Sequence, residues 1–287
     1  MTMSGEAALR PAGSSQLYVI VSDPVSQLQL PAIFNDIFRR AQHDAVLVAL
    51  QVGTDSLDTV IAGLRAIGNL AGIVIGYPHR HAVLRHADSL GEMAQITDAA
   101  NALRRLPDGR WHADMLDGDG FLWGLRAAGH EVAGRHALLV GAGSAGSAIA
   151  ATLLEARLAQ LDIHDLDPSR SHRLAERLHG RWAGRIAVLD TPEADGADLV
   201  INATPLGRHA GDPLPFAPAR LTQGTLVADI VIQSGGTPLL REAARRGLPT
   251  HRGIYMLSEE IRSYAEFFGF SWALDRIGWS EQEYESP

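Results

Sequence analysis

Residues 137–150 read ALLVGAGSAGSAIA, and this stretch constrains the fold more than any other part of the chain. An apolar run enters a turn that contains Gly141, Gly143 and Gly146, and a helical pattern of small residues follows it. This is the G-x-G-x-x-G arrangement of a dinucleotide-binding βαβ unit, in which the glycines permit a tight turn, close approach of a pyrophosphate and close helix packing. The N–H groups at the start of the helix then face the anion. The candidate cofactor-binding residues in this turn are Gly141, Ala142, Gly143, Ser144, Ala145 and Gly146.

A second strand is predicted at 160–165, and it ends in Asp165, 24 residues after Gly141 (165 − 141 = 24). An acidic residue at about this distance binds the adenosine ribose hydroxyls of NAD and repels the 2′-phosphate of NADP. Leu166 comes next, and the first positions of the loop contain no arginine. Arg170 is the nearest cation, and we interpret it as a solvated helix residue. The sequence therefore predicts NAD as the cofactor, with Asp165 and Leu166 at the adenosine end.

The composition excludes several other classes of function. The 287 residues are 46% hydrophobic and 20% charged, with a formal net charge of −8 and no cysteine. These values argue against nucleic acid as a partner and exclude disulfides, thiolate metal sites and a cysteine nucleophile. All 25 basic residues are arginine, so no lysine can act as a base. The uncharged stretch at 136–154 contains a turn and small residues, so it does not predict a membrane span, and we expect a cytoplasmic protein without a signal peptide.

Two α/β domains with a cleft between them are the simplest architecture that accounts for the pattern. The domain predictions are a substrate domain over 16–120 and 256–287, a Rossmann-type parallel-sheet NAD-binding domain over 121–255, and a disordered segment over 1–15. In the first domain, strands are expected at 17–22, 45–52 and 72–77, helices at 31–41, 55–69 and 90–105, and a hairpin at Asp108–Gly109. The second domain is expected to follow a helix at 118–132, with helices at 145–157, 169–179 and 237–246 between strands at 137–141, 160–165, 185–189, 198–202 and 225–231. A last helix, at 256–268, is expected to return to the first domain.

Another group of candidate residues follows the strand predicted at 198–202, at the sheet edge where ligands bind in such folds. This group is Asn202, Ala203, Thr204, Pro205 and Leu206. With Gly207 it reads NATPLG, and this block resembles a signature of the shikimate dehydrogenase family. Three other blocks are also similar to that family: LDGDGF at 116–121, DIV at 229–231 followed by TPLL at 237–240, and GIYML at 253–257. The resemblance covers 17–270 and adds Ile230, Gly253, Met256 and Leu257 to the cofactor-binding candidates.

The resemblance implies hydride transfer between a nicotinamide dinucleotide and a substrate held by both chain ends. The segment HDLD at 164–167 is similar to the NAD-preferring quinate/shikimate branch, whereas the NADP branch carries N-R-T in this loop. The family's N-V-T-x-P-x-K block falls on 74–80, so its catalytic lysine position is Arg80 and its substrate-binding threonine position is Gly76. The serines of its S-x-S-P block become Leu28 and Leu30. The remaining substrate positions are Ile232, Glu260, Asn101 and Asp117, of which only the last two keep the family's residue types.

These replacements predict a substrate with fewer hydroxyl groups than shikimate, because each unpaired buried polar group costs about 1–3 kcal/mol. We expect Arg80 to bind a substrate carboxylate or to pair with Asp117, and Asp117 to accept a hydrogen bond and act as a weak base. His79 and His81 are alternative bases, and with His86 they match no tight metal-ligand pattern. The expected function is an NAD-dependent oxidoreductase acting on a small alcohol or ketone.

Three further questions stay open at this point. Because the family's lysine is missing, a non-catalytic NAD-binding sensor or regulatory protein is the alternative to an enzyme. A weaker alternative is a different enzyme with the same two domains that acts on a folate or an amino acid. The sequence leaves open whether the chain forms a homodimer.

Overall fold

The computed structural model describes residues 11–193, 195–209 and 211–279, which divide into two compact units. Unit 1 comprises 11–91, 99–114 and 264–279, and unit 2 comprises 92–98 and 115–263 apart from positions 194 and 210. The domain boundaries predicted at 120/121 and 255/256 fall inside two helices, α4 (Asp117–Ala127) and α8 (Gly253–Phe268). The first ten residues of the segment predicted to be disordered lie outside the described residues, and residues 11–15 form a turn in which Ser15 accepts a hydrogen bond from the Ala12 N–H.

Unit 1 is built on a six-stranded sheet in the order β2-β1-β3-β5-β6-β4. The strands β2, β1 and β3 are parallel, and β5 runs antiparallel to both β3 and β6. The strands are β1 (Gln16–Ser22), β2 (Ala45–Gln51), β3 (Leu70–Ile75), β4 (Ser89–Leu90), β5 (Ala102–Arg105) and β6 (Trp111–Asp114). The helical elements are α1 (Leu30–Ala41), η1 (Thr54–Ser56), α2 (Leu57–Arg65), η2 (Ala82–His86) and α9 (Ser271–Ile277).

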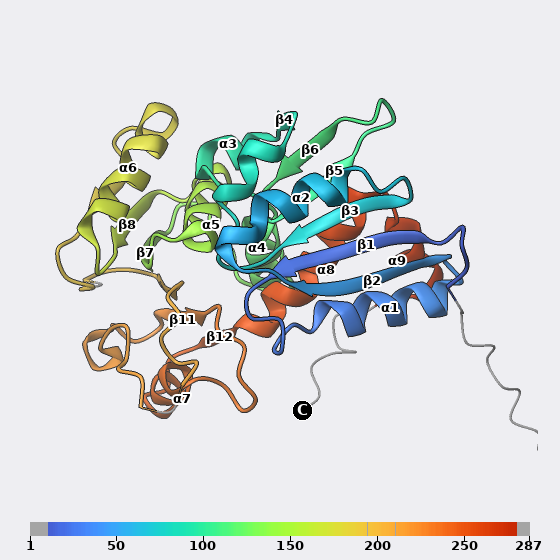
Figure 1. The fold of residues 1–287 in the computed structure, drawn as a ribbon. Helices are drawn as coiled ribbons and strands as arrows, with labels where there is room; N and C mark the ends of the chain where they lie inside the picture. The colour runs from blue at the N-terminus through green and yellow to red at the C-terminus, as the bar shows by residue number, and fades with distance from the viewer. Residues whose placement is uncertain (1–10, 194, 210, 280–287) are drawn as a thin grey trace, which may run out of the picture. The chain divides into compact units, whose positions relative to one another are not determined.

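Helix α1 illustrates why these residues form these elements. Pro31 stands in its first turn, where its fixed φ angle suits a helix and its missing N–H costs nothing. Ile33, Phe34, Ile37 and Phe38 recur at helical spacing, and all four are buried. Figure 1 shows α1 lying along β2, so this apolar stripe is the face that the helix packs on the sheet.

The segment at 90–105 was predicted as one helix, and that prediction is wrong. It holds the end of β4, the short helix α3 (Glu92–Thr97) and β5. Asp98 has φ +53°, a left-handed conformation that ends α3. Leu103 then pairs with Ile73 of β3 and is fully buried, so tertiary pairing overrides the local helical spacing. The hairpin predicted at Asp108–Gly109 is present, with Gly109 at φ +84°.

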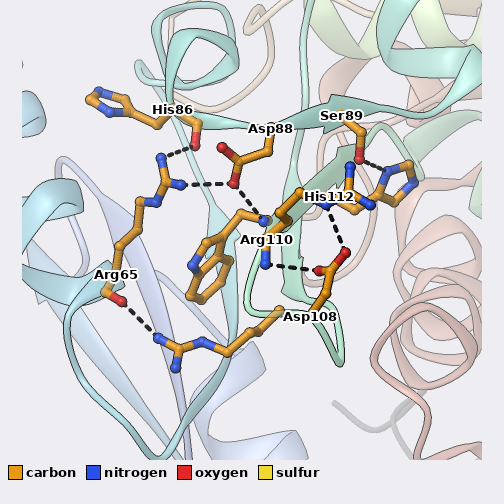
Figure 2. Close-up of polar contacts among 9 residues, drawn as sticks. Arg65, His86, Asp88, Ser89, Asp108, Arg110 and His112 are labelled. Atoms are coloured by element: carbon orange, nitrogen blue, oxygen red, sulfur yellow. Dashed lines mark hydrogen bonds and ion pairs between the residues drawn. The ribbon is translucent and has the colours of Figure 1, made fainter.

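A polar network holds β4 and this hairpin in place (Figure 2). Arg65 donates to the His86 carbonyl at 2.8 Å and to the Asp88 carboxylate at 2.7 Å. The same Asp88 oxygen accepts the Trp111 N–H at 2.8 Å. These contacts lower the pKa of Asp88, the Trp111 hydrogen bond most of all. The network is a structural brace for a two-residue edge strand.

Unit 2 contains a six-stranded parallel sheet in the order β12-β11-β10-β7-β8-β9. Read from the other side, this is the 3-2-1-4-5-6 order of a dinucleotide-binding fold, in which ligands bind where the order reverses, between β7 and β10. The strands are β7 (His136–Val140), β8 (Gln160–His164), β9 (Ile186–Val188), β10 (Leu199–Asn202), β11 (Leu226–Asp229) and β12 (Thr250–Arg252). Besides α3, α4 and η3 (Pro218–Arg220), the helices are α5 (Ser144–Glu155), α6 (Pro168–Trp182), α7 (Pro238–Arg245) and α8, most of which belongs to unit 2.

Helix α4 packs unusually closely on its neighbours. A Cβ atom on Gly118 would lie 2.6 Å from the Ala148 carbonyl oxygen of α5. A Cβ atom on Gly120 would lie 2.8 Å from the Met256 carbonyl oxygen of α8, and one on Gly124 would lie 3.0 Å from the Tyr255 backbone. Gly118 and Gly120 therefore let two helix backbones approach more closely than a side chain would allow, and Gly124 leaves only a tight fit for one.

Candidate functional site

The glycine turn lies between β7 and α5, at the point where the strand order of unit 2 reverses. Gly141 has φ +109°, and a Cβ atom there would lie 2.8 Å from the Ala203 backbone. A Cβ atom on Gly146 would lie 2.0 Å from the Gly141 carbonyl oxygen. By contrast, a Cβ atom on Gly143 would meet nothing within 4 Å. The fold itself thus requires two of the glycines, Gly141 and Gly146, whereas Gly143 borders open space.

The start of α5 is suited to an anion. Gly143 is its N-cap residue in an extended conformation, and no side chain caps the first turn. The N–H groups of Ser144, Ala145 and Gly146 lie in this turn, where helical N–H groups lack partners within the helix. A helix of 12 residues with an uncapped, glycine-lined N-terminus is the arrangement that holds dinucleotide phosphates.

Asp165 lies directly after β8, and its carboxylate is fixed beside the glycine turn. One carboxylate oxygen accepts the Ala142 N–H at 2.7 Å, and the other accepts the Asp167 N–H at 2.9 Å. A carboxylate offers about four lone-pair positions, so both oxygens can still accept hydrogen bonds from ribose hydroxyls. The strand end and the turn therefore hold the Asp165 carboxylate in place beside the glycine turn.

The loop after Asp165 adds a second carboxylate and an exposed leucine. Leu166 is 85% exposed. Asp167 caps α6 by accepting the Ser169 N–H at 3.0 Å, and hydrogen bonds from Ser169 lower the pKa of Asp167. Arg170, the cation nearest in sequence, lies 3.6 Å from the Asp167 carboxylate in an exposed pair. Two carboxylates, those of Asp165 and Asp167, therefore precede this arginine in the loop.

Asn202 ends β10 and organises the loop that follows it. Its amide group donates to the Leu206 carbonyl at 3.0 Å and to Asp229 at 2.9 Å. Its oxygen accepts the N–H of Thr204 at 3.0 Å and the hydroxyl of the same residue at 2.7 Å. The Asn202 side chain is completely buried, and its hydrogen bonds to Thr204 and Leu206 position residues 203–206. Ala203 and Thr204 are half-buried, Pro205 is exposed, and Leu206 is half-buried.

The same network continues into β11 and α7. Asp229 accepts hydrogen bonds from Asn202, from the Val231 N–H at 3.0 Å and from the Thr237 hydroxyl at 2.6 Å. Burial raises the pKa of Asp229 to about 6, while these three hydrogen bonds favour its charged form. Thr237 in turn caps α7 by accepting the Leu240 N–H. The network links the ends of β10 and β11, and its central residues, Asp229 and Thr237, belong to the DIV and TPLL blocks of the sequence.

The last cofactor candidates lie at the junction of β12 and α8. A Cβ atom on Gly253 would lie 2.5 Å from the Ile230 carbonyl oxygen, so this glycine lets α8 start against the end of β11. Met256 is buried in the core of unit 2, while Ile230 and Leu257 are half-buried. Met256 therefore packs in the core beside the candidate site.

Three substrate-side candidates also belong to unit 2. Asp117 is the first residue of α4 and is 1% exposed. Glu260 lies on α8 and is buried, whereas Ile232 follows β11 and is 44% exposed. The glycines beside Asp117 explain the LDGDGF block, because they hold the helix that carries this acid tightly against α5 and α8.

The other substrate-side candidates belong to unit 1. Leu28 is half-buried and Leu30 is buried in the first turn of α1. Gly76 follows β3, and Asn101, completely buried, precedes β5. Arg80 is half-buried, and its Nε donates to the Ile75 carbonyl at 3.3 Å. These positions gather at one end of the unit 1 sheet, because the antiparallel β5 begins where β3 ends.

The structure removes one of the alternative bases. His79 is 1% exposed, and its Nε2 lies 2.6 Å from the Val52 carbonyl oxygen, so the ring is a buried structural contact. His81 is exposed, and His86 pairs with Asp58 at 2.7 Å. Among the described residues, no group of three or more acidic or histidine side chains is placed to hold a metal ion. Within the same residues, no helix is long and apolar enough to cross a membrane.

Comparison with known proteins decides the family. The family described as "Shikimate dehydrogenase substrate binding domain" matches residues 20–103. The shikimate dehydrogenase (NADP(+)) of Rubrobacter xylanophilus is 40% identical over 250 residues, which are 85% of this chain and 87% of the relative. The chain belongs to the shikimate dehydrogenase family. It is therefore a shikimate dehydrogenase-type oxidoreductase that acts on a CH–OH group with a nicotinamide dinucleotide, as the resemblance predicted.

Solved structures that are similar to this chain confirm the predicted fold class. Quinate dehydrogenase from Corynebacterium glutamicum in complex with NAD superposes with a TM-score of 0.79 at 25% identity, over 92% of this chain and 98% of that one. The 5-ketofructose reductase of Gluconobacter sp. strain CHM43 also gives a TM-score of 0.79, at 27% identity, over 92% of this chain and 99% of that one. Proteins similar to this chain are thus named for different substrates and for both dinucleotides.

Proposed function

We propose that this shikimate dehydrogenase family member uses NAD in preference to NADP and oxidises or reduces a substrate with fewer hydroxyl groups than shikimate. The observation that carries the cofactor half is the Asp165 carboxylate, which is fixed by the Ala142 N–H beside the glycine turn. This carboxylate accepts hydrogen bonds from the ribose hydroxyls of NAD and repels the 2′-phosphate of NADP. Leu166 stands where the NADP branch has an arginine, and its exposed side chain offers nothing to a phosphate.

The glycine turn and the start of α5 would hold the pyrophosphate, and residues 203–206 and 230 would border the rest of the dinucleotide. When bound, the nicotinamide ring supplies the position that gives or accepts hydride. The chain's own contribution is to orient that ring through the loop that Asn202 fixes and to hold the adenosine ribose through Asp165.

Calorimetric titration with NAD and with NADP tests the cofactor half. We expect NAD to bind at least tenfold more tightly, which corresponds to about 1.4 kcal/mol. The Leu166→Arg variant adds the missing cation and should narrow the ratio, while Leu214→Arg, an equivalent change at another exposed leucine, should leave it unchanged. The Rubrobacter xylanophilus relative is named for NADP(+), so this preference would distinguish the two proteins. Equal affinities of the unmodified protein for NAD and NADP would overturn this part of the proposal.

The substrate half rests on what the strand ends of unit 1 can offer. Leu28 and Leu30 present no hydroxyl groups, and Gly76 has no room for one because a Cβ atom there would lie 2.4 Å from the Ser22 hydroxyl oxygen. A triol would leave several of its hydroxyls unpaired at such positions, at about 1–3 kcal/mol each. Arg80 is suited to a carboxylate, which its planar guanidinium can bind through two parallel hydrogen bonds.

Steady-state rates with shikimate, quinate and a panel of simpler hydroxy acids and alcohols, followed by NADH absorbance, test the substrate half. We expect the highest kcat/KM for a compound with fewer hydroxyls than shikimate. A kcat/KM for shikimate above that of every simpler compound would refute it. No turnover of any compound, with NAD still bound, would instead favour the non-catalytic alternative.

Asp117 is proposed as the group that accepts a hydrogen bond from the reacting hydroxyl and assists its deprotonation. Asp117→Asn should lower kcat by about 100-fold, because general base assistance contributes 10²–10⁴-fold. Asp119→Asn is the matched control, because it makes the same isosteric substitution two residues away, at an exposed position of α4. Equal rates for the two variants would exclude Asp117 from this role.

A further inference from the structure

The carboxyl ends of β1 and β3 are joined by a side chain that the resemblance does not single out. Ser22, the last residue of β1, is 3% exposed. Its hydroxyl donates to the Tyr77 carbonyl at 3.0 Å, and the same carbonyl accepts the Asp23 N–H at 2.8 Å. The Gly76 N–H donates to the Val21 carbonyl at 2.8 Å, which brings the two strand ends together.

Ser22 also fills the space into which a side chain at position 76 would point. A Cβ atom on Gly76 would lie 2.4 Å from the Ser22 Oγ and 2.7 Å from the Ser22 Cβ. Rotation of the hydroxyl could relieve the first contact, but the second is fixed by the backbone of β1. The Gly76 backbone is not in the left-handed region, so space, not conformation, is what requires glycine here.

The loop that follows Gly76 carries Arg80 and is held at both ends. His79 contacts the Val52 carbonyl with its buried ring, and the Arg80 carbonyl accepts the Ala100 N–H at 2.8 Å. Ser22 provides the one side-chain hydrogen bond to the Tyr77 carbonyl among the described contacts. Loss of that bond loosens the loop at its start without touching Arg80 itself.

We propose that Ser22 is a positioning and specificity-determining residue of the substrate site. It fixes the 76–80 loop and hence Arg80, and it keeps position 76 free of any side chain. Its single hydroxyl proton is donated to Tyr77, so neither position 22 nor position 76 offers a donor to a substrate hydroxyl. The positioning part rests on the proposed function, in which Arg80 binds a carboxylate, whereas the steric part does not.

The steric part is tested by a double-mutant cycle on thermal unfolding of the full chain. Gly76→Ala alone should lower Tm by about 5 °C, because it overpacks a buried contact. In the Ser22→Gly background, the nearest neighbour of the new methyl is the residue 22 Cα at 3.5 Å, an ordinary contact. The same substitution should then change Tm by about 1 °C or less. Equal Tm losses in the two backgrounds would overturn the proposal.

The positioning part is tested with shikimate as the carboxylate probe and by hydrogen exchange. Ser22→Ala should raise the KM for shikimate about fivefold at unchanged kcat and NAD affinity, and it should speed exchange in peptides covering residues 76–80. In an Arg80→Ala background it should no longer affect KM. Ser26→Ala, at an exposed serine of the neighbouring loop, is the matched control and should change neither quantity.

The outcomes separate this inference from the proposed function. An unchanged KM for Arg80→Ala alone would refute the carboxylate role of Arg80, and the Tm cycle would still decide the steric part. If Ser22→Ala raises KM equally in both backgrounds, or leaves exchange at 76–80 unchanged, Ser22 does not act through the loop and the positioning part is wrong.

Discussion

Replacing Asp165 with asparagine removes one charge and almost no volume, so it isolates the contribution of the carboxylate. In the protein, two backbone N–H groups point at this side chain, Ala142 at 2.7 Å and Asp167 at 2.9 Å. Asparagine has only one acceptor oxygen, so its NH2 group must face one of these donors. Hydrogen bonds to a charged acceptor contribute about 1.5–3 kcal/mol, and one of the two is lost.

The binding consequence is distinct from this loss of stability. Ribose hydroxyls would donate to a neutral oxygen in place of a charged one, so we expect the Kd for NAD to rise about tenfold, or about 1.4 kcal/mol. NADP loses the repulsion between its 2′-phosphate and the carboxylate, so its Kd should rise less or fall. Calorimetric titration of both dinucleotides measures the ratio, and unfolding in urea measures the stability.

Asp167→Asn is the control for this prediction. It makes the same change two residues along, where the carboxylate caps α6 and is not bonded to the glycine turn. Asparagine is an equally good N-cap, so stability should hold, and the NAD to NADP ratio should move less than in Asp165→Asn. If Asp165→Asn leaves that ratio unchanged, the fixed carboxylate does not select the cofactor and our reasoning fails.

Three further predictions concern unit 2. Gly146→Ala should unfold the turn or destabilise it strongly, because its Cβ atom would lie 2.0 Å from the Gly141 carbonyl oxygen. Gly143→Ala should keep the wild-type Tm and lose dinucleotide affinity. Equal losses of Tm in the two variants would contradict this prediction. Asn202→Ala should weaken NAD binding, which calorimetry would measure. It should also lower the free energy of unfolding in urea by about 1–3 kcal/mol, because it leaves buried partners without a hydrogen bond. Burial lowers the pKa of His251 from 6.5 to about 4, so its contribution to the free energy of unfolding is intact above pH 6.5 and falls at lower pH, where the unfolded chain gains a proton. At pH 5 this effect should lower the free energy of unfolding by about 2 kcal/mol. His251→Phe should reduce this loss of stability at acid pH.

Periodicity and glycine spacing predicted the architecture well where local signals and tertiary structure agree. The glycine turn, the strand that leads into Asp165 and the amphipathic α1 all lie where the pattern placed them, because burial on one face dictates each pattern. The helix predicted at 90–105 is wrong for the opposite reason. The helical spacing of these residues is real, but Asp98 adopts a left-handed conformation and Leu103 pairs with β3, and neither is encoded locally.

The parts of the site that sequence could not predict are contacts between residues far apart in the chain. Gly76 departs from the family pattern, and only the position of Ser22, 54 residues earlier, explains this departure. His79 had the chemistry of a base, yet its ring contacts the Val52 carbonyl in the interior. Likewise, Asn202 had the place of a ligand-binding residue, and the structure shows that it holds a loop.

The three glycines of α4 have a consequence for how the chain acquires its structure. Each glycine lowers intrinsic helix stability by about 1 kcal/mol relative to alanine, so this segment has little tendency to become helical alone. Its close contacts are made with Ala148 on one side and with Tyr255 and Met256 on the other. The last two emerge from the ribosome roughly 130 residues after Gly124. Helix α4, and the acid at its start, should therefore be among the last elements of unit 2 to become ordered during synthesis.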